Sequence, residues 1–326
     1  MVKKLKLASM ILFFMVFAVL LSGCGSKKEE ELTVNIGYFN NITHAQALLM
    51  KSEGTLEKSF GEKTKINWQA FNAGPAEVEA LFAGGIDIGY IGPVPAVTAN
   101  VKSNSDVVIL SGATKGGAVL LQRKGAGIQG VSDLAGKTVS IPQMGNTQHL
   151  SLLHLLKENG LEAGEGADKV KVVDVANADV ANVMDRGDID AALVPEPWGA
   201  TLMGQGAELV LDYDKVYMDG KYDVAVVVVR KEFKEKHPEL VEKFLEEHKK
   251  AADTINSEKE TSLKKVNDEI NKATGKSLTP EVINAAFERI GVDSTLNRES
   301  IQGFAEISKE EGFIPSVPEE ASLYAE

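Results

Sequence analysis

The chain has 326 residues, of which 44% are hydrophobic, and a formal net charge of −12 at pH 7. Its length exceeds the usual size of a single hydrophobic core and favours two domains. The acidic balance excludes nucleic acid as a partner, because phosphates attract basic surfaces, but it leaves a small anion possible, since charge is screened over about 8 Å at physiological ionic strength.

The N-terminus predicts export and a lipid anchor. Lysines precede an apolar run over residues 7–21, which is too short to span a membrane and ends in Ser22-Gly23-Cys24. Leu21 to Cys24 resembles a bacterial lipobox, and Cys24 is the only cysteine. We expect residues 1–23 to be removed, lowering the net charge to −15. Cys24 would then carry diacylglycerol and palmitate on the extracytoplasmic face of the cell membrane, with residues 24–32 as a tether. The alternative is an ordinary signal peptide with an incidental cysteine.

Strands and helices alternate through the first part of the mature chain. The pattern predicts strands over residues 32–38, 65–70 and 86–91, and helices over 43–53 and 75–84. Gly54 is a helix C-cap, Pro75 fits a first helical position, and Gly92-Pro93 ends the third strand in a proline loop.

The same unit then occurs a second time. Strands are expected over residues 138–141, 170–175 and 189–194, and helices over 147–158 and 180–187. Asn41-Ile42-Thr43-His44 corresponds to Asn146-Thr147-Gln148-His149, and Gly85-Ile86-Asp87 corresponds to Gly187-Asp188-Ile189-Asp190. The repeat indicates an α/β protein with two similar lobes, each a mixed, mostly parallel sheet flanked by helices.

We expect lobe 1 to contain residues 33–114 and 222–326, and lobe 2 residues 115–221. A strand over 224–229 and amphipathic helices after Pro238 would complete lobe 1. Ligands of such sheets bind outside the carboxyl ends of the strands, which places a cleft between the lobes. Crossings near 114–117 and 221–223 would form its hinge.

The two equivalent helix starts, near residues 41–45 and 145–149, are the candidate ligand site. Each offers unpaired N–H groups and the positive end of a helix dipole, which together suit an oxyanion such as a sulfonate. The alternative is that the asparagines are only N-caps. The predicted contacts are Asn40, Asn41, Thr43, His44, Gly92, Pro93, Thr114, Gly117, Gly145, Asn146, Thr147, Gln148 and Trp198.

Several residues could take part in chemistry, but their patterns do not support it. His44 and His149 lack the spacing of a metal pair, so His44 is expected to donate a hydrogen bond, or else to be a packed histidine. Glu196 is a poor partner for an anion and is expected to brace its own loop. We found no catalytic elbow and no Walker-type loop, so we predict a binding protein without enzymatic activity, metal or cofactor.

Three segments together resemble the periplasmic binding proteins for aliphatic sulfonates, taurine and nitrate. They are residues 37–45, residues 83–89 and Pro195-Glu196-Pro197-Trp198. The resemblance implies a type II periplasmic-binding fold and a monomer that delivers its ligand to an ABC permease with separate ATPase subunits. One departure is Asn40, where the family often has a proline.

Other ligands are open from the sequence. A pyrimidine or vitamin precursor would need aromatic side chains in the cleft, and Tyr38, Phe39, Tyr90, Trp198 and Tyr222 are available. Nitrate is a further candidate. An enzyme on the same fold, converting a pyrimidine with His44 and His149, is the alternative from another class.

Overall fold

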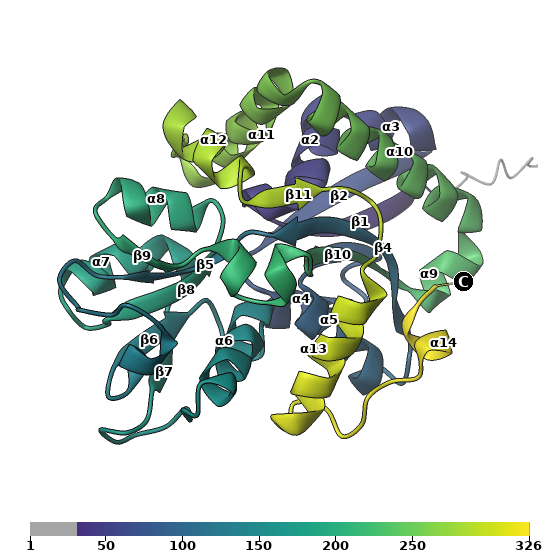
Figure 1. Cartoon of the computed structure of the whole chain (residues 1–326). Coiled ribbons are helices and arrows are strands. Elements are labelled where there is room, and N and C mark those ends of the chain that lie inside the picture. Colours follow the sequence, from purple (N-terminus) through teal and green to yellow (C-terminus); the bar gives the residue numbers. More distant parts are fainter. Residues whose placement is uncertain (1–30, 326) are drawn as a thin grey trace, which may run out of the picture. The chain divides into compact units, whose positions relative to one another are not determined.

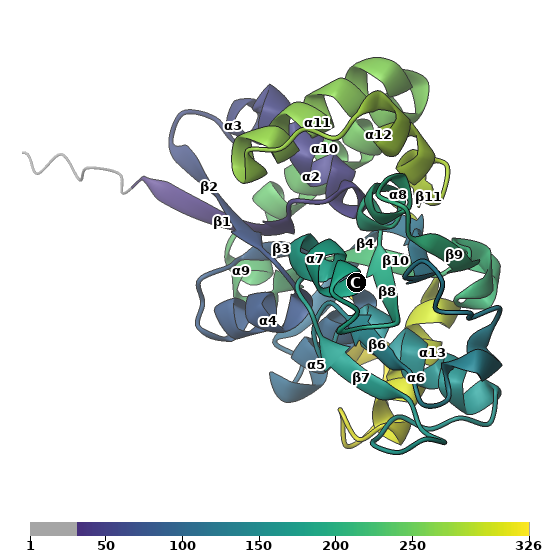
Figure 2. The ribbon, with the colours of Figure 1, turned by 90° about the vertical axis from the view of Figure 1, so that its left-hand side faces the viewer.

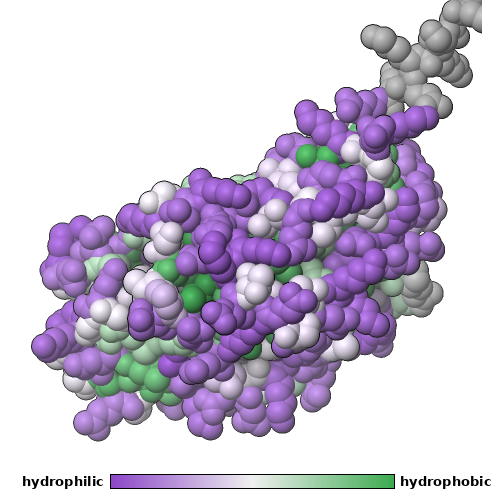
Figure 3. Space-filling view, turned by 90° about the horizontal axis from the view of Figure 1, so that it is seen from above, coloured by the Kyte–Doolittle hydropathy of each residue, from purple (hydrophilic) through white to green (hydrophobic). Residues whose placement is uncertain are grey.

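The structure is a computed structural model that describes residues 31–325. The predicted leader, the lipidation site Cys24 and most of the tether lie outside these residues. From Thr33 onward the chain forms one compact unit that contains two sheets, each covered by helices (Figure 1). No helix within residues 31–325 is long and apolar enough to cross a membrane. The face seen from above is mainly hydrophilic, with small apolar areas (Figure 3).

The first sheet has six strands in the order β11-β4-β10-β3-β1-β2. Their bounds are β1 Leu32–Phe39, β2 Thr64–Phe71, β3 Ile88–Ile91, β4 Val107–Gly116, β10 Asp223–Arg230 and β11 Ile290–Val292. One side is covered by α2 (Ala45–Glu53), α3 (Thr55–Phe60), α10 (Pro238–Ser257) and α11 (Lys259–Thr274). The other side is covered by α4 (Gly74–Phe82), α5 (Pro93–Lys102) and α13 (Arg298–Glu310) (Figure 1). Shorter helices are α9 (Lys231–Lys236), α12 (Pro280–Phe287) and α14 (Glu320–Leu323).

The second sheet has five strands in the order β7-β6-β8-β5-β9. Their bounds are β5 Ala118–Gln122, β6 Thr138–Ile141, β7 Lys171–Asp174, β8 Ala191–Pro195 and β9 Glu208–Leu211. Helix α6 (Thr147–Glu158) packs on one face, while α7 (Val180–Asp185) and α8 (Trp198–Gly204) pack on the other. The chain enters this sheet after Gly116 and leaves it between β9 and β10.

Both sheets are mixed, so the predicted two-lobed α/β fold is confirmed with a larger antiparallel share than expected. Parallel pairings join the strands of the repeated unit, β1 with β3 and β6 with both β7 and β8. Antiparallel pairings attach β4, β10 and β11 in one sheet and β5 and β9 in the other. These added strands lie outside the segments that repeat in the sequence.

The repeat is also visible in the hydrogen bonds of Asp87 and Asp190. Each carboxylate accepts a backbone N–H from the first strand of its repeated unit, from Asn35 at 2.9 Å and from Thr138 at 3.0 Å. The other oxygen pairs at 2.8 Å with an arginine that follows the antiparallel neighbour, Arg230 and Arg123 respectively. These aspartates therefore join strands and have no part in a ligand site.

Three helices, α3, α5 and α8, were missed by the sequence analysis. The proline loop expected at Gly92-Pro93 is instead the start of α5, with proline in the first turn. A proline at the first helical position costs no hydrogen bond, so the same residues that end a strand can begin a helix. Gly54 ends α2 in the left-handed conformation, as expected, but α3 follows at once.

Gly37 and Gly89 are required by a buried acid. A side chain at either glycine would collide with the carboxyl group of Glu77, which extends from the first turn of α4 onto β1 and β3. Glu77 is fully buried, and burial raises its pKa well above the ordinary value. Burial therefore favours the protonated, uncharged form of this carboxyl group.

Helix α13 packs into two hydrophobic cores. Ile301 and Ala305 belong to the core beneath the six-stranded sheet. Phe304 and Ile307 belong to the core between α6 and the five-stranded sheet. This C-terminal helix therefore connects the two lobes by its side chains.

Candidate functional site

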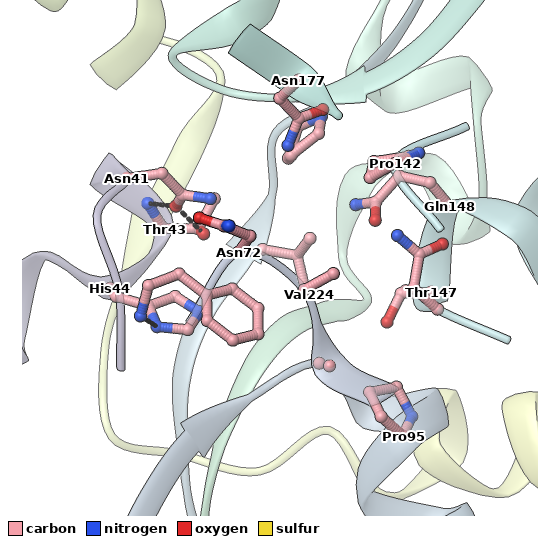
Figure 4. A pocket seen from close by; sticks show the side chains of 16 residues that line it. Asn41, Thr43, His44, Asn72, Pro95, Pro142, Thr147, Gln148, Asn177 and Val224 are labelled. Atoms are coloured by element: carbon pink, nitrogen blue, oxygen red, sulfur yellow. Dashed lines mark hydrogen bonds between the residues drawn. The ribbon is translucent and has the colours of Figure 1, made fainter. Parts of the chain in front are cut away.

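A narrow pocket lies where the two predicted helix starts face each other (Figure 4). We call it the inner pocket; its volume is about 30 Å³. A water molecule needs roughly 10–15 Å³ by this measure, so the space suits one small polar group. The pocket is lined by Phe39, Asn41, Thr43, His44, Asn72, Ala73, Gly74, Gly92, Pro95, Pro142, Asn146, Thr147, Gln148, Asn177, Pro195 and Val224.

The first helix start is a short 3₁₀ turn, Ile42–His44, that leads into α2. Asn41 caps it, because its Oδ1 accepts the backbone N–H of Thr43 at 2.9 Å and also the Thr43 hydroxyl. Thr114 fixes the turn from β4 by donating its hydroxyl to the Thr43 carbonyl at 2.7 Å. Asn41 therefore has the N-cap role that the sequence left open and lines the pocket as well.

His44 enters the inner pocket as a neutral donor. Its Nδ1 accepts the backbone N–H of Phe39 at 2.8 Å, which leaves the proton of a neutral ring on Nε2. The ring stacks on Phe39 with centroids 4.3 Å apart. Burial lowers the pKa of His44 to about 3, so the ring stays uncharged at neutral pH.

The second helix start repeats these bonds at α6. Asn146 Oδ1 accepts the backbone N–H of His149 at 2.9 Å, and His149 Nδ1 accepts that of Gly145 at 3.0 Å. Burial lowers the pKa of His149 to about 4. Its ring meets the edge of Phe313, with centroids 5.4 Å apart, and does not line the pocket.

The lobes touch at the floor of the site. Gly92, which precedes α5, lies so close to the Thr147 hydroxyl that a side chain at Gly92 would collide with it. The Thr147 hydroxyl is buried and has no hydrogen-bond partner within residues 31–325. It is therefore free to bond a ligand in the inner pocket.

Two asparagines of the pocket were missed by the sequence analysis. Asn72 follows β2 and Asn177 follows β7, so they occupy corresponding places in the two units. Both point toward the pocket from opposite lobes (Figure 4). The repeat could have revealed them, since the strand ends that precede them had been matched.

The inner pocket has polar side chains but no charged ones among its lining residues. Its polar side chains are amides, hydroxyls and the neutral His44, and no lysine or arginine of residues 31–325 lines it. Helix starts supply N–H groups and partial positive charge, which bind anions without a full cation. The arrangement suits a permanently ionised oxyanion head.

A larger space, the outer cleft, opens beside the inner pocket and has a volume of about 1030 Å³. It is bounded by α8, by the end of α11 and by α12, which approaches α8 across the cleft (Figure 2). The predicted contacts Asn40 and Trp198 line this outer cleft, and Asn41 lines both spaces. The predicted site is thus divided into two compartments.

Four predicted contacts line neither space, and each has another partner. Pro93 starts α5, Thr114 holds Thr43, and Gly145 donates to His149. Gly117 faces Ile290, against which a side chain there would press. These four residues therefore have structural roles outside the two spaces.

Glu196 braces its own loop, as predicted. Its Oε2 accepts the backbone N–H of Ala200 at 2.9 Å, and Arg289 Nη1 lies 3.5 Å from Oε1. Burial raises the pKa of Glu196 to about 7.

Few aromatic rings are available to stack on a ligand. Tyr38, Tyr90 and Tyr222 are buried in the cores, whereas Phe39 and Trp198 line the site. Within the part of the chain that the structure describes, no group of histidine, cysteine and acidic side chains could hold a metal ion.

Comparisons with known proteins agree on one family and one fold. The NMT1-like family matches residues 27–267. The taurine-binding periplasmic protein of Escherichia coli (strain K12) is 31% identical over 212 residues, which cover 65% of this chain and 63% of that protein. The match thus spans less than two thirds of that relative's length.

Two solved structures resemble the whole described unit. The periplasmic aliphatic sulphonate binding protein of Escherichia coli gives a TM-score of 0.70 at 25% identity, covering 88% of this chain and 94% of that one. The alkanesulfonate-binding protein of Xanthomonas axonopodis pv. citri, bound to MOPS, gives 0.74 at 21% identity, covering 90% and 99%. At 21% identity, the second similarity shows a common fold and nothing more.

Proposed function

The chain belongs to the NMT1-like family, and on this premise we propose that it is the extracytoplasmic solute-binding protein of an ABC-type importer. Its ligand is a small oxyanion, taurine or an aliphatic sulfonate, whose head occupies the inner pocket. Relatives that bind taurine and aliphatic sulfonates support this class.

The proposal rests on the uncharged hydrogen-bond donors of the inner pocket. A sulfonate is ionised at every physiological pH and presents three acceptor oxygens. Thr147, Gln148 and His44 can donate to these oxygens, with N–H groups of the two helix starts beside them. Because His44 stays neutral, binding needs no proton transfer.

The remaining partners follow from the same proposal. A permease accepts the ligand, separate ATPase subunits drive import, and the binding protein acts as a monomer without altering its cargo. Cys24 carries the lipid that keeps it at the membrane.

Calorimetry with taurine, ethanesulfonate, nitrate and sulfate tests the proposal. Taurine or ethanesulfonate should bind, and Gln148→Ala should weaken binding about tenfold, because an amide donor to a charged group is lost. Gln148 is 6% exposed and lines the pocket, whereas Gln129 is exposed on lobe 2, so Gln129→Ala is the matched control. Binding of a pyrimidine in place of all four anions would refute the assignment.

A further inference from the structure

The outer cleft continues directly from the inner pocket. Six residues line both spaces: Phe39, Asn41, Asn72, Ala73, Pro142 and Asn177. The inner pocket holds about 30 Å³ and the outer cleft about 1030 Å³. A sulfonate head in the first space therefore has its organic body in the second.

The outer cleft is not a gap left by separated lobes. The lobes already meet in the adjoining inner pocket, where Gly92 lies against Thr147. They also meet along α8 and α12, where a methyl group at Gly204 would lie 3.8 Å from Cγ2 of Val282. The outer cleft is thus present in a structure whose lobes are in contact, and its volume lies at the upper end of the roughly 300–1,000 Å³ of ordinary small-molecule sites.

Apolar side chains of both lobes line the outer cleft. They are Phe71, Trp198, Ile270, Leu278 and Val282. The charged residues among the lining, Asp179, Lys276 and Glu281, are exposed to solvent. Such walls favour a body of carbon over the short ammonium-bearing arm of taurine.

One wall lies outside the segment that the family shares. Ile270 to Val282 forms the end of α11, the following loop and the start of α12, whereas the family match ends at residue 267. All residues of the inner pocket fall within that match. The inner pocket therefore lies within the family match, whereas this wall lies beyond its end.

We propose that the outer cleft selects sulfonates with a bulky apolar body, of six or more carbon atoms, and that the wall over residues 270–282 makes this selection. The inference rests on the proposed function, because the sulfonate head anchors the ligand. Taurine then binds weakly, since it fills the inner pocket and leaves the apolar walls in water.

A ligand series on the purified protein tests the inference. Ethane-, butane-, hexane- and octanesulfonate share one head, and each buried methylene should tighten binding roughly two- to fourfold. Octanesulfonate should then bind at least about 60-fold more tightly than ethanesulfonate. The ring-bearing 2-(cyclohexylamino)ethanesulfonate should likewise bind more tightly than taurine. Measurable but equal affinities across the series overturn the inference and leave the proposed function standing, whereas no binding of any sulfonate overturns the proposed function.

Leu278→Ser tests the wall itself. Asn267 holds the backbone of Leu278 by two hydrogen bonds of 2.8 Å, so the loop keeps its place without the side chain. The variant should flatten the dependence of affinity on chain length, and urea unfolding shows whether it is folded. Leu209→Ser is the control, because Leu209 is 40% exposed on β9 and lies outside the cleft. If affinity rises with chain length as steeply in Leu278→Ser as in the wild type, the wall does not make the selection.

Discussion

The two helix starts share their sequence and their hydrogen bonds but differ in what they offer a ligand. Each has an asparagine cap and a histidine whose Nδ1 accepts a backbone N–H of its own loop. His44 lines the inner pocket beside Phe39, whereas His149 turns to Phe313. The repeat therefore preserves the bracing of both loops, while ligand contact depends on where the lobes face each other.

The strongest test of this comparison alters the point where the lobes meet. Gly92→Ala puts a methyl group against the Thr147 hydroxyl, while the φ of −68° at Gly92 accepts alanine. We expect a loss of ligand affinity of about 100-fold, because overpacking a closed contact costs roughly 1–3 kcal/mol. Gly130→Ala, with open space around it, should change nothing. Calorimetry measures both variants, and equal affinities would show that the lobes need not touch at Gly92.

The second test replaces the two histidines separately. His44→Ala removes a donor from the pocket and should weaken binding about 10- to 30-fold. His149→Ala should change affinity less than threefold and lower the free energy of unfolding by about 1–3 kcal/mol, because the N–H of Gly145 loses its partner. Titration and urea unfolding separate these effects. Similar losses of affinity in both variants would contradict the asymmetry.

The third test uses pH, where the two histidines should behave alike. Burial holds the pKa of His44 at about 3 and that of His149 at about 4, below the ordinary 6.5. As pH falls below 6.5 the unfolded chain takes up protons that the folded protein does not, so stability is lost. When the pH is lowered from 7.5 to 5.5, each histidine should reduce the free energy of unfolding by about 1 kcal/mol. In His149→Gln, urea unfolding at the two pH values should show a pH-dependent loss of stability that is smaller by the contribution of His149. A loss as large as in the wild type would disprove the buried neutral ring.

The smallest effects are expected at the second pair of corresponding residues. Asn72→Ala and Asn177→Ala each remove one amide from the pocket, so each should weaken binding about three- to tenfold. Equal losses would mark the part of the site where the repeat is functionally symmetric. If only one variant loses affinity, the two asparagines differ in ligand contact as the two histidines do.

Periodic and capped elements could be predicted from the sequence. Helix α6 has the predicted bounds, residues 147–158, because its asparagine cap and leucines give clear signals. Helix α5 was missed, since Gly92-Pro93 is equally compatible with a turn and a helix start. Sequence patterns describe one element at a time, and a proline does not tell which element follows.

Part of the candidate site could likewise be predicted from the sequence, and part could not. Seven predicted contacts line the inner pocket because they lie at the helix starts: Asn41, Thr43, His44, Gly92, Asn146, Thr147 and Gln148. Asn72 and Asn177 were missed, since asparagine after a strand usually marks a turn. The wall over residues 270–282 depends on how a helical hairpin packs over the other lobe, which no local pattern encodes.

Helix α13 has a consequence for how the chain reaches its native state. Its apolar residues contribute to both hydrophobic cores, and it follows the strands of both sheets in the sequence. Neither lobe can therefore complete its core before residues 298–310 have been synthesised. Because both cores share this helix, the two lobes should melt in a single cooperative transition.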